Sequence, residues 1–229
     1  MSQKGWLILF FADLLLDILA LIFNLQGIRI VTKPLLMPLL MVWFIISSNS
    51  NLPVRYLIVS ALFFSWLGDI FLLNEQNDQT FFVAGLSCFF ITHLFYILFF
   101  LQIRKRAGHQ RSWSPMVISA VALYIIAFVL LMLPQLGNMK IPVALFGFVI
   151  GTTLILAIHT TGAAGARSAS WLIAGAALLI ASHTMLGIFK FYYTFPSAYL
   201  LIMITYGIAQ FAIVNGSLQY LAAEKKKPA

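Results

Sequence analysis

Eight stretches of mostly apolar residues follow one another along the chain, and each is long enough to cross a lipid bilayer as a helix. About 20 helical residues match the thickness of the hydrocarbon core of a bilayer. Strands are not expected, because period-two alternation is absent and open sheet edges cannot face lipid. The sequence therefore predicts an all-α fold, a polytopic membrane bundle of about eight transmembrane helices. We expect the helices near 5–25, 32–49, 54–73, 79–101, 114–134, 140–160, 168–190 and 196–221.

The composition leaves no room for a soluble domain. Hydrophobic residues make up 62% of the 229 residues and charged residues only 9%, whereas a soluble domain has about 25% charged residues. The connections between the apolar stretches are short and polar, so we expect one integral membrane domain, 1–229. In so apolar a chain, the net charge of +8 is better explained by loop charges that set topology than by nucleic-acid binding.

The Lys and Arg residues are distributed unequally between the two sides of the predicted bundle. The side that carries both termini holds ten of them and the opposite side four, Arg29, Lys33, Lys140 and Lys190. Positively charged loops face the cytoplasm. The sequence therefore predicts a multi-pass protein of the bacterial inner membrane with both termini in the cytoplasm.

Asp69 lies in the apolar stretch FSWLGDIFLL. An ionised Asp at the centre of a membrane helix costs roughly 2.5–3.5 kcal/mol, so such residues usually mark functional sites. In the predicted topology, Asp69 and His183 lie at nearly the same depth in two helices that both run outward, and they could meet in one cavity. The structural alternative is burial of each against backbone carbonyls or a serine, such as Ser65 or Ser182.

Two acidic residues, Asp13 and Asp17, lie four positions apart and therefore share one face of the first helix. Two carboxylates so placed cannot both ionise cheaply in a low dielectric. Either this face has a function, or the pair is neutralised by Lys33 or by another cation near a helix end.

Other polar pairs also share helix faces: His93 with Tyr96, and Tyr206 with Gln210. Hydrogen bonding between neighbouring helices is the alternative to a functional role for such pairs. His159, near the end of its helix, is interpreted as structural. The sequence has no H-E-x-x-H, no Cys pair and no G-x-S-x-G motif, so neither a metal, a cofactor nor a serine esterase is expected.

Five short motifs occur in a characteristic order: TKPLLMPLL (32–40), GD (68–69), HLFY (93–96), SH (182–183) and TYGIAQ (205–210). In their order and spacing they resemble the YhhN-type lysoplasmalogenase family of membrane proteins. The resemblance implies cleavage of the vinyl ether bond of lysoplasmalogens, which releases a fatty aldehyde and a glycerophospho-headgroup. By the same resemblance, the polar positions of the family correspond to Lys33, Asp69, His93, Tyr96, Tyr206 and Gln210. One position departs from the family pattern, because Ser182 is followed by His183 where the family has Asp.

Vinyl ether hydrolysis begins with protonation of a carbon atom, and water then captures the oxocarbenium ion. An apolar setting favours the protonated form of a carboxyl group, which makes Asp69 a candidate acid. A neutral imidazole can accept a proton from water, so His183 is the candidate base. We therefore predict Asp69 and His183 as catalytic residues. The predicted substrate-binding residues are Lys33, His93, Tyr96, Tyr206 and Gln210.

Two functions of other classes remain open from the sequence. Intramembrane Asp and His residues also form proton relays, which would suit a proton-coupled transporter or lipid flippase. A non-catalytic member that binds lysolipid would have kept the pocket after losing the second Asp.

Overall fold

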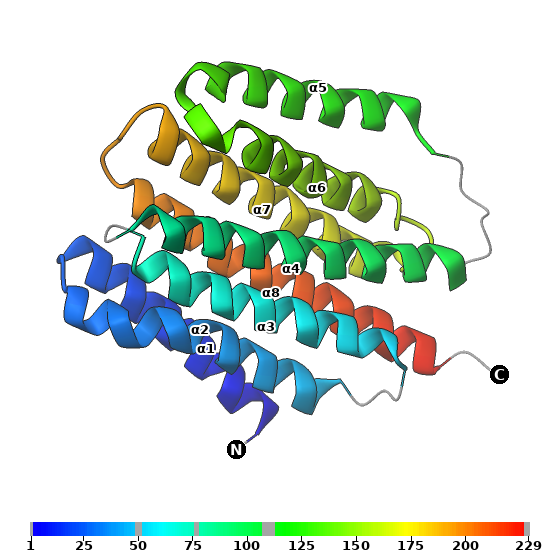
Figure 1. The fold of residues 1–229 in the computed structure, drawn as a ribbon. Coiled ribbons are helices and arrows are strands. Elements are labelled where there is room, and N and C mark those ends of the chain that lie inside the picture. Colours follow the sequence, from blue (N-terminus) through cyan, green and yellow to red (C-terminus); the bar gives the residue numbers. More distant parts are fainter. Residues whose placement is uncertain (1, 49–51, 76–77, 107–112, 227–229) are drawn as a thin grey trace. The chain divides into compact units, whose positions relative to one another are not determined.

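The computed structural model describes residues 2–48, 52–75, 78–106 and 113–226 (Figure 1). These residues form eight α-helices and two short 3-10 helices, and none of them forms a strand. The all-α fold predicted from the sequence is confirmed. The helices are α1 (Gln3–Ile22), α2 (Gln26–Ser47), α3 (Val54–Leu73), α4 (Gln79–Arg106), α5 (Pro115–Met132), α6 (Lys140–Ile158), α7 (Ala166–Phe191) and α8 (Ala198–Lys225), with η1 (Leu133–Gln135) and η2 (Gly137–Met139) between α5 and α6.

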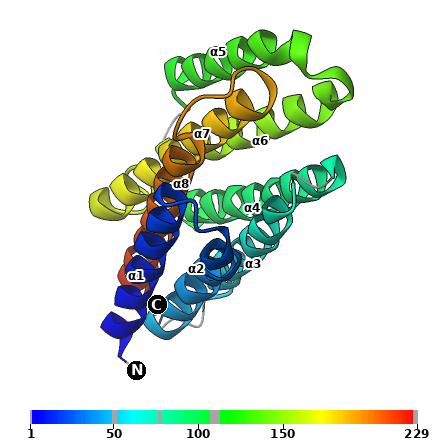
Figure 2. The ribbon, with the colours of Figure 1, turned by 90° about the vertical axis from the view of Figure 1, so that its left-hand side faces the viewer.

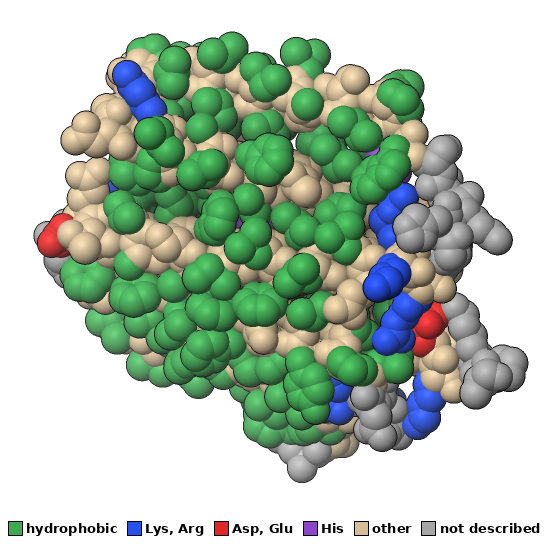
Figure 3. All heavy atoms as spheres, turned by 45° about the vertical axis from the view of Figure 1, so that its right-hand side comes forward, with side chains coloured by type: hydrophobic (Ala, Val, Ile, Leu, Met, Phe, Trp, Pro, Cys, Tyr) green, Lys and Arg blue, Asp and Glu red, His purple; other side chains and the backbone are tan. Residues whose placement is uncertain are grey.

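All eight α-helices are long and apolar enough to span a membrane. Many large apolar side chains face outward, among them Met116, which is 83% exposed, and Ile141, which is 72% exposed. On the face drawn in Figure 3, hydrophobic side chains cover most of the helices, and Lys and Arg lie toward the edges. Such a surface is stable in lipid and not in water. The protein is therefore an integral membrane protein.

The chain divides into two compact units. Unit 1 comprises residues 1–99 and 217–229, and unit 2 comprises residues 100–216. The boundaries fall inside α4 and α8, so each of these two helices contributes to both units. One domain over 1–229 stays a prediction.

Unit 1 begins with a tight hairpin of α1 and α2 (Figure 2), and α2 in turn packs along α3. Asn24 ends α1 with a φ of 55°, a left-handed conformation that Asn tolerates better than most residues. The Leu25 N–H then donates to the Ala20 carbonyl oxygen at 2.8 Å, as in a Schellman motif. This turn lets α2 begin immediately, at Gln26.

The start of α2 differs from the prediction. The predicted second helix begins at residue 32, whereas α2 begins at Gln26 and so includes Arg29. The reason is that Arg29 is buried against α1 and not solvated in a loop. Arg29 and Lys33 are consequently one turn apart inside a helix and are not loop charges.

Small residues bring α3 and α4 close together in unit 1. A Cβ atom on Gly68 would lie 3.0 Å from the Phe89 ring, and one on Gly85 would lie 3.0 Å from the Leu72 side chain. Two turns away from Gly85, the Thr92 hydroxyl of α4 donates to the Ala61 carbonyl oxygen of α3 at 3.2 Å. This close packing determines where Asp69, the residue after Gly68, is held.

The N-terminus of α4 is capped by Asp78. Its carboxylate accepts hydrogen bonds from the Thr80 backbone N–H at 2.8 Å and from the Thr80 hydroxyl at 2.9 Å. These two bonds, the backbone one first, hold the pKa of Asp78 below its ordinary value. Asp78 is thus explained by helix capping.

In unit 2, α5, α6 and α7 run side by side (Figure 1). The pair α7 and α8 is in closest contact at Gly175. A Cβ atom on Gly175 would lie 2.6 Å from Ile213 Cγ1 and 2.9 Å from the Ala209 carbonyl oxygen. The backbones of α7 and α8 can therefore approach each other only because this residue is glycine.

Replacing Gly175 with Ala should destabilise the protein by about 1–3 kcal/mol, because the methyl group has no space between the two backbones. The measurement is the thermal unfolding midpoint of the purified protein in detergent. Gly27→Ala is the matched control, since nothing lies within 4 Å of that Cβ position and Ala favours a helix over Gly. An unchanged midpoint for Gly175→Ala would contradict the close approach of α7 and α8.

Candidate functional site

Asp69 is buried in unit 1, with 2% of its surface exposed. It lies in the last two turns of α3, four residues before Leu73, where Gly68 allows α4 to approach. A carboxyl group in such surroundings requires a compensating partner.

Lys33 supplies a cation for Asp69. It is buried in α2 with 7% of its surface exposed, and it interacts electrostatically with Asp69, Glu75 and Asp17 as well as with Arg29. The three carboxyl groups come from α3, from the residues directly after α3, and from α1. Lys33 is therefore the residue on which the acidic side chains of three segments of unit 1 converge.

Asp17 is completely buried and is held by two residues of α2. Its Oδ1 atom accepts a hydrogen bond from the Thr32 hydroxyl at 2.7 Å and lies 3.8 Å from Arg29 Nε. Thr32, Arg29 and Lys33 lie on adjacent turns of α2 and so can face the same neighbour. The alternative from the sequence, a helix-end cation that pairs with the acidic face of α1, is thus realised by Arg29.

Asp13 lies one turn before Asp17 and is also buried, with 7% of its surface exposed. Asp17 is its charged neighbour. Neither Asp13 Oδ2 nor Asp17 Oδ2 has a hydrogen-bond partner within the described ranges.

His93 and Tyr96 are both buried on α4, with 1% and 0% of their surfaces exposed. Their rings lie edge to face with centroids 6.2 Å apart. The neighbouring Thr92 accepts a hydrogen bond from Ser65 of α3 at 3.3 Å. His93 lies 14 residues into α4, about 21 Å along the helix axis, and is thus farther from the helix end than Asp69 is.

In unit 2, His183 is buried on α7, and its ring lies edge to face with Phe146 of α6 at 5.1 Å between centroids. The preceding Ser182 donates to the Ile202 carbonyl oxygen of α8 at 3.0 Å. Tyr206 and Gln210 follow on α8, buried with 3% and 1% of their surfaces exposed. The Ser182 bond therefore sets the register of α7 against α8 in this region.

The predicted site residues fall into two groups. Unit 1 contains Asp69, Lys33, His93 and Tyr96, and among these Lys33 and Asp69 interact electrostatically. Unit 2 contains His183, Tyr206 and Gln210. The meeting of Asp69 with His183 stays a prediction.

His159 has contacts that fit the structural interpretation. Its Nδ1 atom lies 2.6 Å from the Ile155 carbonyl oxygen, and its Nε2 atom accepts the Ser114 N–H at 2.8 Å. The guanidinium of Arg104 donates to the His159 carbonyl oxygen at 2.7 Å and lies over the Trp113 ring at 4.1 Å. This cluster ties the end of α4 and the start of α5 to the end of α6.

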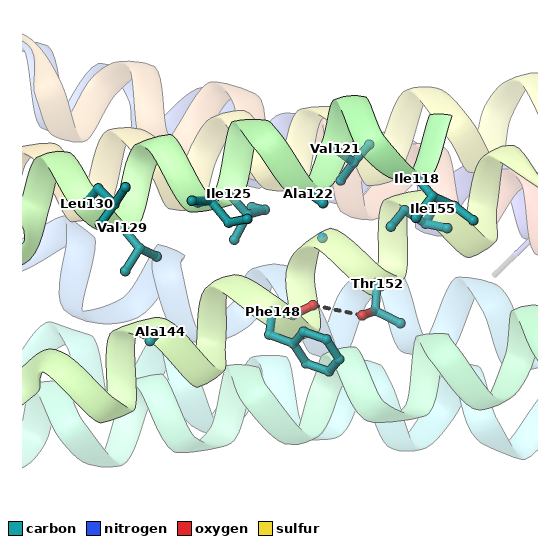
Figure 4. A pocket seen from close by; sticks show the side chains of 12 residues that line it. Ile118, Val121, Ala122, Ile125, Val129, Leu130, Ala144, Phe148, Thr152 and Ile155 are labelled. Carbon is teal, nitrogen blue, oxygen red and sulfur yellow. Dashed lines mark hydrogen bonds between the residues drawn. The ribbon is translucent and has the colours of Figure 1, made fainter. Parts of the chain in front are cut away.

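An apolar groove of about 420 Å³ lies between α5 and α6 (Figure 4). Ile125 and Val129 of α5 line it on one side, and Phe148 and Gly151 of α6 line it on the other. Thr152 also lines the groove, and its hydroxyl group donates to the Phe148 carbonyl oxygen of the same helix at 2.8 Å. The groove can accommodate hydrocarbon and offers no acid or base.

Glu75 and Arg29 are site residues that the sequence reasoning missed. Glu75 lies in the turn after α3 and Arg29 in the first turn of α2, and both are buried and interact with Lys33. The spacing of Arg29 and Lys33, four residues apart, was the available signal for Arg29. For the described residues, no group of three His, Cys, Asp or Glu side chains could hold a metal ion.

Comparison with known proteins gives a family match over most of the chain. The model of the YhhN family matches residues 28–217. The chain belongs to the YhhN family. All seven predicted site residues lie inside the matched range, whereas α1, with Asp13 and Asp17, precedes it.

A relative of this YhhN protein is the lysoplasmalogenase TMEM86B of Rattus norvegicus. The two are 30% identical over 187 residues, which cover 82% of this chain and 71% of the rat protein. No solved structure matches the chain.

Replacing Thr32 with Val should destabilise this YhhN protein by about 1–3 kcal/mol, because the buried Asp17 carboxylate loses its hydroxyl donor without gaining water. The thermal unfolding midpoint in detergent measures the change. Thr152→Val is the control, since that hydroxyl bonds only a carbonyl of its own helix. Equal effects of the two substitutions would mean that the Thr32–Asp17 bond contributes nothing specific.

Proposed function

We propose that this protein is a lysoplasmalogenase-like membrane hydrolase that cleaves the vinyl ether bond of a lysoplasmalogen into a fatty aldehyde and a glycerophospho-headgroup. Membership of the YhhN family and the similarity to a rat lysoplasmalogenase support the reaction class. The observation that carries the proposal in the structure is the buried pair of Lys33 and Asp69.

The depth of this pair supports a lipid substrate. Asp69 lies four residues from the end of α3 and Lys33 seven residues from the start of α2, about 6 and 10 Å along the helices. In a spanning bundle, we expect a pair at these distances to lie just inside the hydrocarbon boundary. The vinyl ether bond of a lysoplasmalogen lies at this level, because it joins the glycerol oxygen to the first carbon of the chain.

The first proposed step is proton transfer to carbon. In the reactive form Asp69 carries the proton and Lys33 is neutral, and Asp69 delivers this proton to the second carbon of the alkenyl chain and becomes a carboxylate. The first carbon and the ether oxygen then share the positive charge of an oxocarbenium ion. An adjacent carboxylate stabilises such a cation, as in glycosidases.

The second proposed step is the capture of the cation by water. His183, in its neutral form, accepts a proton from the water molecule as its oxygen bonds to the first carbon. The resulting hemiacetal breaks its bond to the glycerol oxygen, which takes up a proton, and the chain leaves as an aldehyde. Lys33, His93, Tyr96, Tyr206 and Gln210 are the residues that we propose for substrate binding.

Purified wild-type protein in detergent should release fatty aldehyde from lysoplasmenyl-ethanolamine or lysoplasmenyl-choline. Asp69→Asn should lower this turnover by about 10²–10⁴-fold, because an amide cannot deliver the proton, while lysolipid binding stays largely intact. Mass spectrometry of derivatised aldehyde measures the product. Glu224→Gln, which removes a carboxylate near the C-terminal end of α8, is the control and should keep wild-type turnover.

Wild-type protein that binds lysolipid but releases no aldehyde, beside an active relative with Asp at the position of His183, would refute the hydrolase proposal. The non-catalytic lysolipid-binding alternative would then stand. Under that alternative, His183→Asp restores the acidic residue of the family pattern and should bring turnover back.

The pH dependence of turnover tests the two roles together. If Asp69 acts protonated and His183 acts neutral, turnover rises with pH as His183 loses its proton and falls again as Asp69 loses its own. The two limbs belong to the coupled pair and not to single residues. His183→Gln should flatten the acidic limb and leave residual turnover, whereas a variant with an unchanged acidic limb would exclude His183 as the base.

A further inference from the structure

The acidic pair on α1 lies outside the reaction proposed above. Asp13 and Asp17 share the face of α1 that packs against α2, and both are more than nine-tenths buried. They also precede the residues that match the family model. A function for this pair must therefore be derived from the surroundings of the two carboxyl groups in this chain.

One carboxylate oxygen of Asp13 and one of Asp17 lack a hydrogen-bond donor among the described residues. Asp17 Oδ1 is occupied by Thr32 and has Arg29 beside it. Asp17 Oδ2 and Asp13 Oδ2 are buried and have no donor among the described residues. Buried acceptors without donors are rare in folded proteins and costly. The two oxygens thus lack a donor within the described part of the chain.

The charges around the pair point to a positively charged donor. Among the described residues of unit 1, four acidic side chains are buried, those of Asp13, Asp17, Asp69 and Glu75, against two buried Lys and Arg side chains, Arg29 and Lys33. The chain as a whole has the opposite balance, with 14 Lys and Arg against six Asp and Glu. Such a buried acidic excess is relieved by protonation of a carboxyl group or by a bound cation.

A primary ammonium group fits both observations. It carries a positive charge and three N–H donors, the inventory of a lysine side chain. On adjacent helical turns the Cβ atoms of Asp13 and Asp17 lie about 5–6 Å apart, so both carboxyl groups can reach one nitrogen at about 2.8 Å. A quaternary ammonium has no N–H donor and is recognised by aromatic rings instead.

The cations next to the acidic pair could bind the phosphate of the same lipid headgroup. Arg29 lies beside Asp17, and Lys33 follows it by one turn of α2. Guanidinium and ammonium groups bind phosphate. Carboxylates on α1 and cations on α2 therefore match a zwitterion with a phosphate and a primary amine, near the end of the hairpin where headgroups lie.

We propose that Asp13 and Asp17 form an ammonium subsite that selects lysolipids with an ethanolamine headgroup over those with choline. This inference rests on the proposed function, since it assigns the headgroup of the same lysolipid substrate. Asp13 makes the selective contact, and Asp17 is kept in place by Thr32 and Arg29.

The test uses saturated ether lysolipids, which lack the vinyl ether bond and report binding without turnover. We expect wild-type protein in lipid nanodiscs to bind the ethanolamine ether lysolipid about tenfold more tightly than the choline one, as one charge-assisted contact can provide. Asp13→Asn should reduce this ratio to about one by weakening ethanolamine binding alone, and Asp13→Glu should retain part of it. Glu224→Gln, which removes a carboxylate from the same unit, should retain all of it.

Equal binding of the two headgroups by wild-type protein would overturn the proposal without the need for any variant. An unchanged ratio of ethanolamine to choline binding in a folded Asp13→Asn protein would also overturn it. Asp13 and Asp17 would then be explained as two carboxyl groups that share a proton. These results are independent of aldehyde release. A protein that prefers ethanolamine but releases no aldehyde would refute the hydrolase and retain the ammonium subsite.

Discussion

A lysine inside an apolar helix bundle needs negative charges beside it, and Lys33 has three carboxyl groups within electrostatic reach. Removing a charge from water costs several kcal/mol unless it is paired and hydrogen-bonded. Asp17 and Asp69 come from α1 and α3, the helices that precede and follow α2 in the chain, and Glu75 comes directly after α3. The arrangement of the first three helices thus depends on satisfying this one cation together with Arg29.

Close helix packing determines how these groups are held. Gly68 precedes Asp69 and lets the Phe89 ring lie against the α3 backbone, so the carboxyl group emerges from a tightly packed part of α3. In unit 2, Gly175 and the Ser182 bond to Ile202 fix α7 against α8 next to His183. Proton transfer requires side chains that are held in place in this way, because the donor must lie within hydrogen-bond reach of the atom that it protonates.

His183 distinguishes this chain from the family pattern described above. A second Asp would add another buried negative charge, whereas a neutral imidazole adds none and can pack edge to face with Phe146. The substitution therefore changes the charge of the proposed site while it keeps a group that can accept a proton. The acidic excess that remains lies in unit 1, in part on α1, where it suits a cationic headgroup.

The fold class and the eight spanning helices follow from the sequence alone, because each apolar stretch must satisfy its backbone hydrogen bonds internally in lipid. It also singled out Asp69 and His183, since polar groups in such stretches are costly enough to require a reason, whereas Lys33 was a site residue only through the family resemblance. It misplaced the start of α2, because hydropathy treats Arg29 as solvated and carries no information on Asp17 across the hairpin. The tertiary structure adds that Lys33 interacts electrostatically with Asp69 and Glu75 and that, among the described residues, Asp13 Oδ2 has no donor. Those facts depend on which faces of neighbouring helices meet, and helical periodicity within one segment does not determine that.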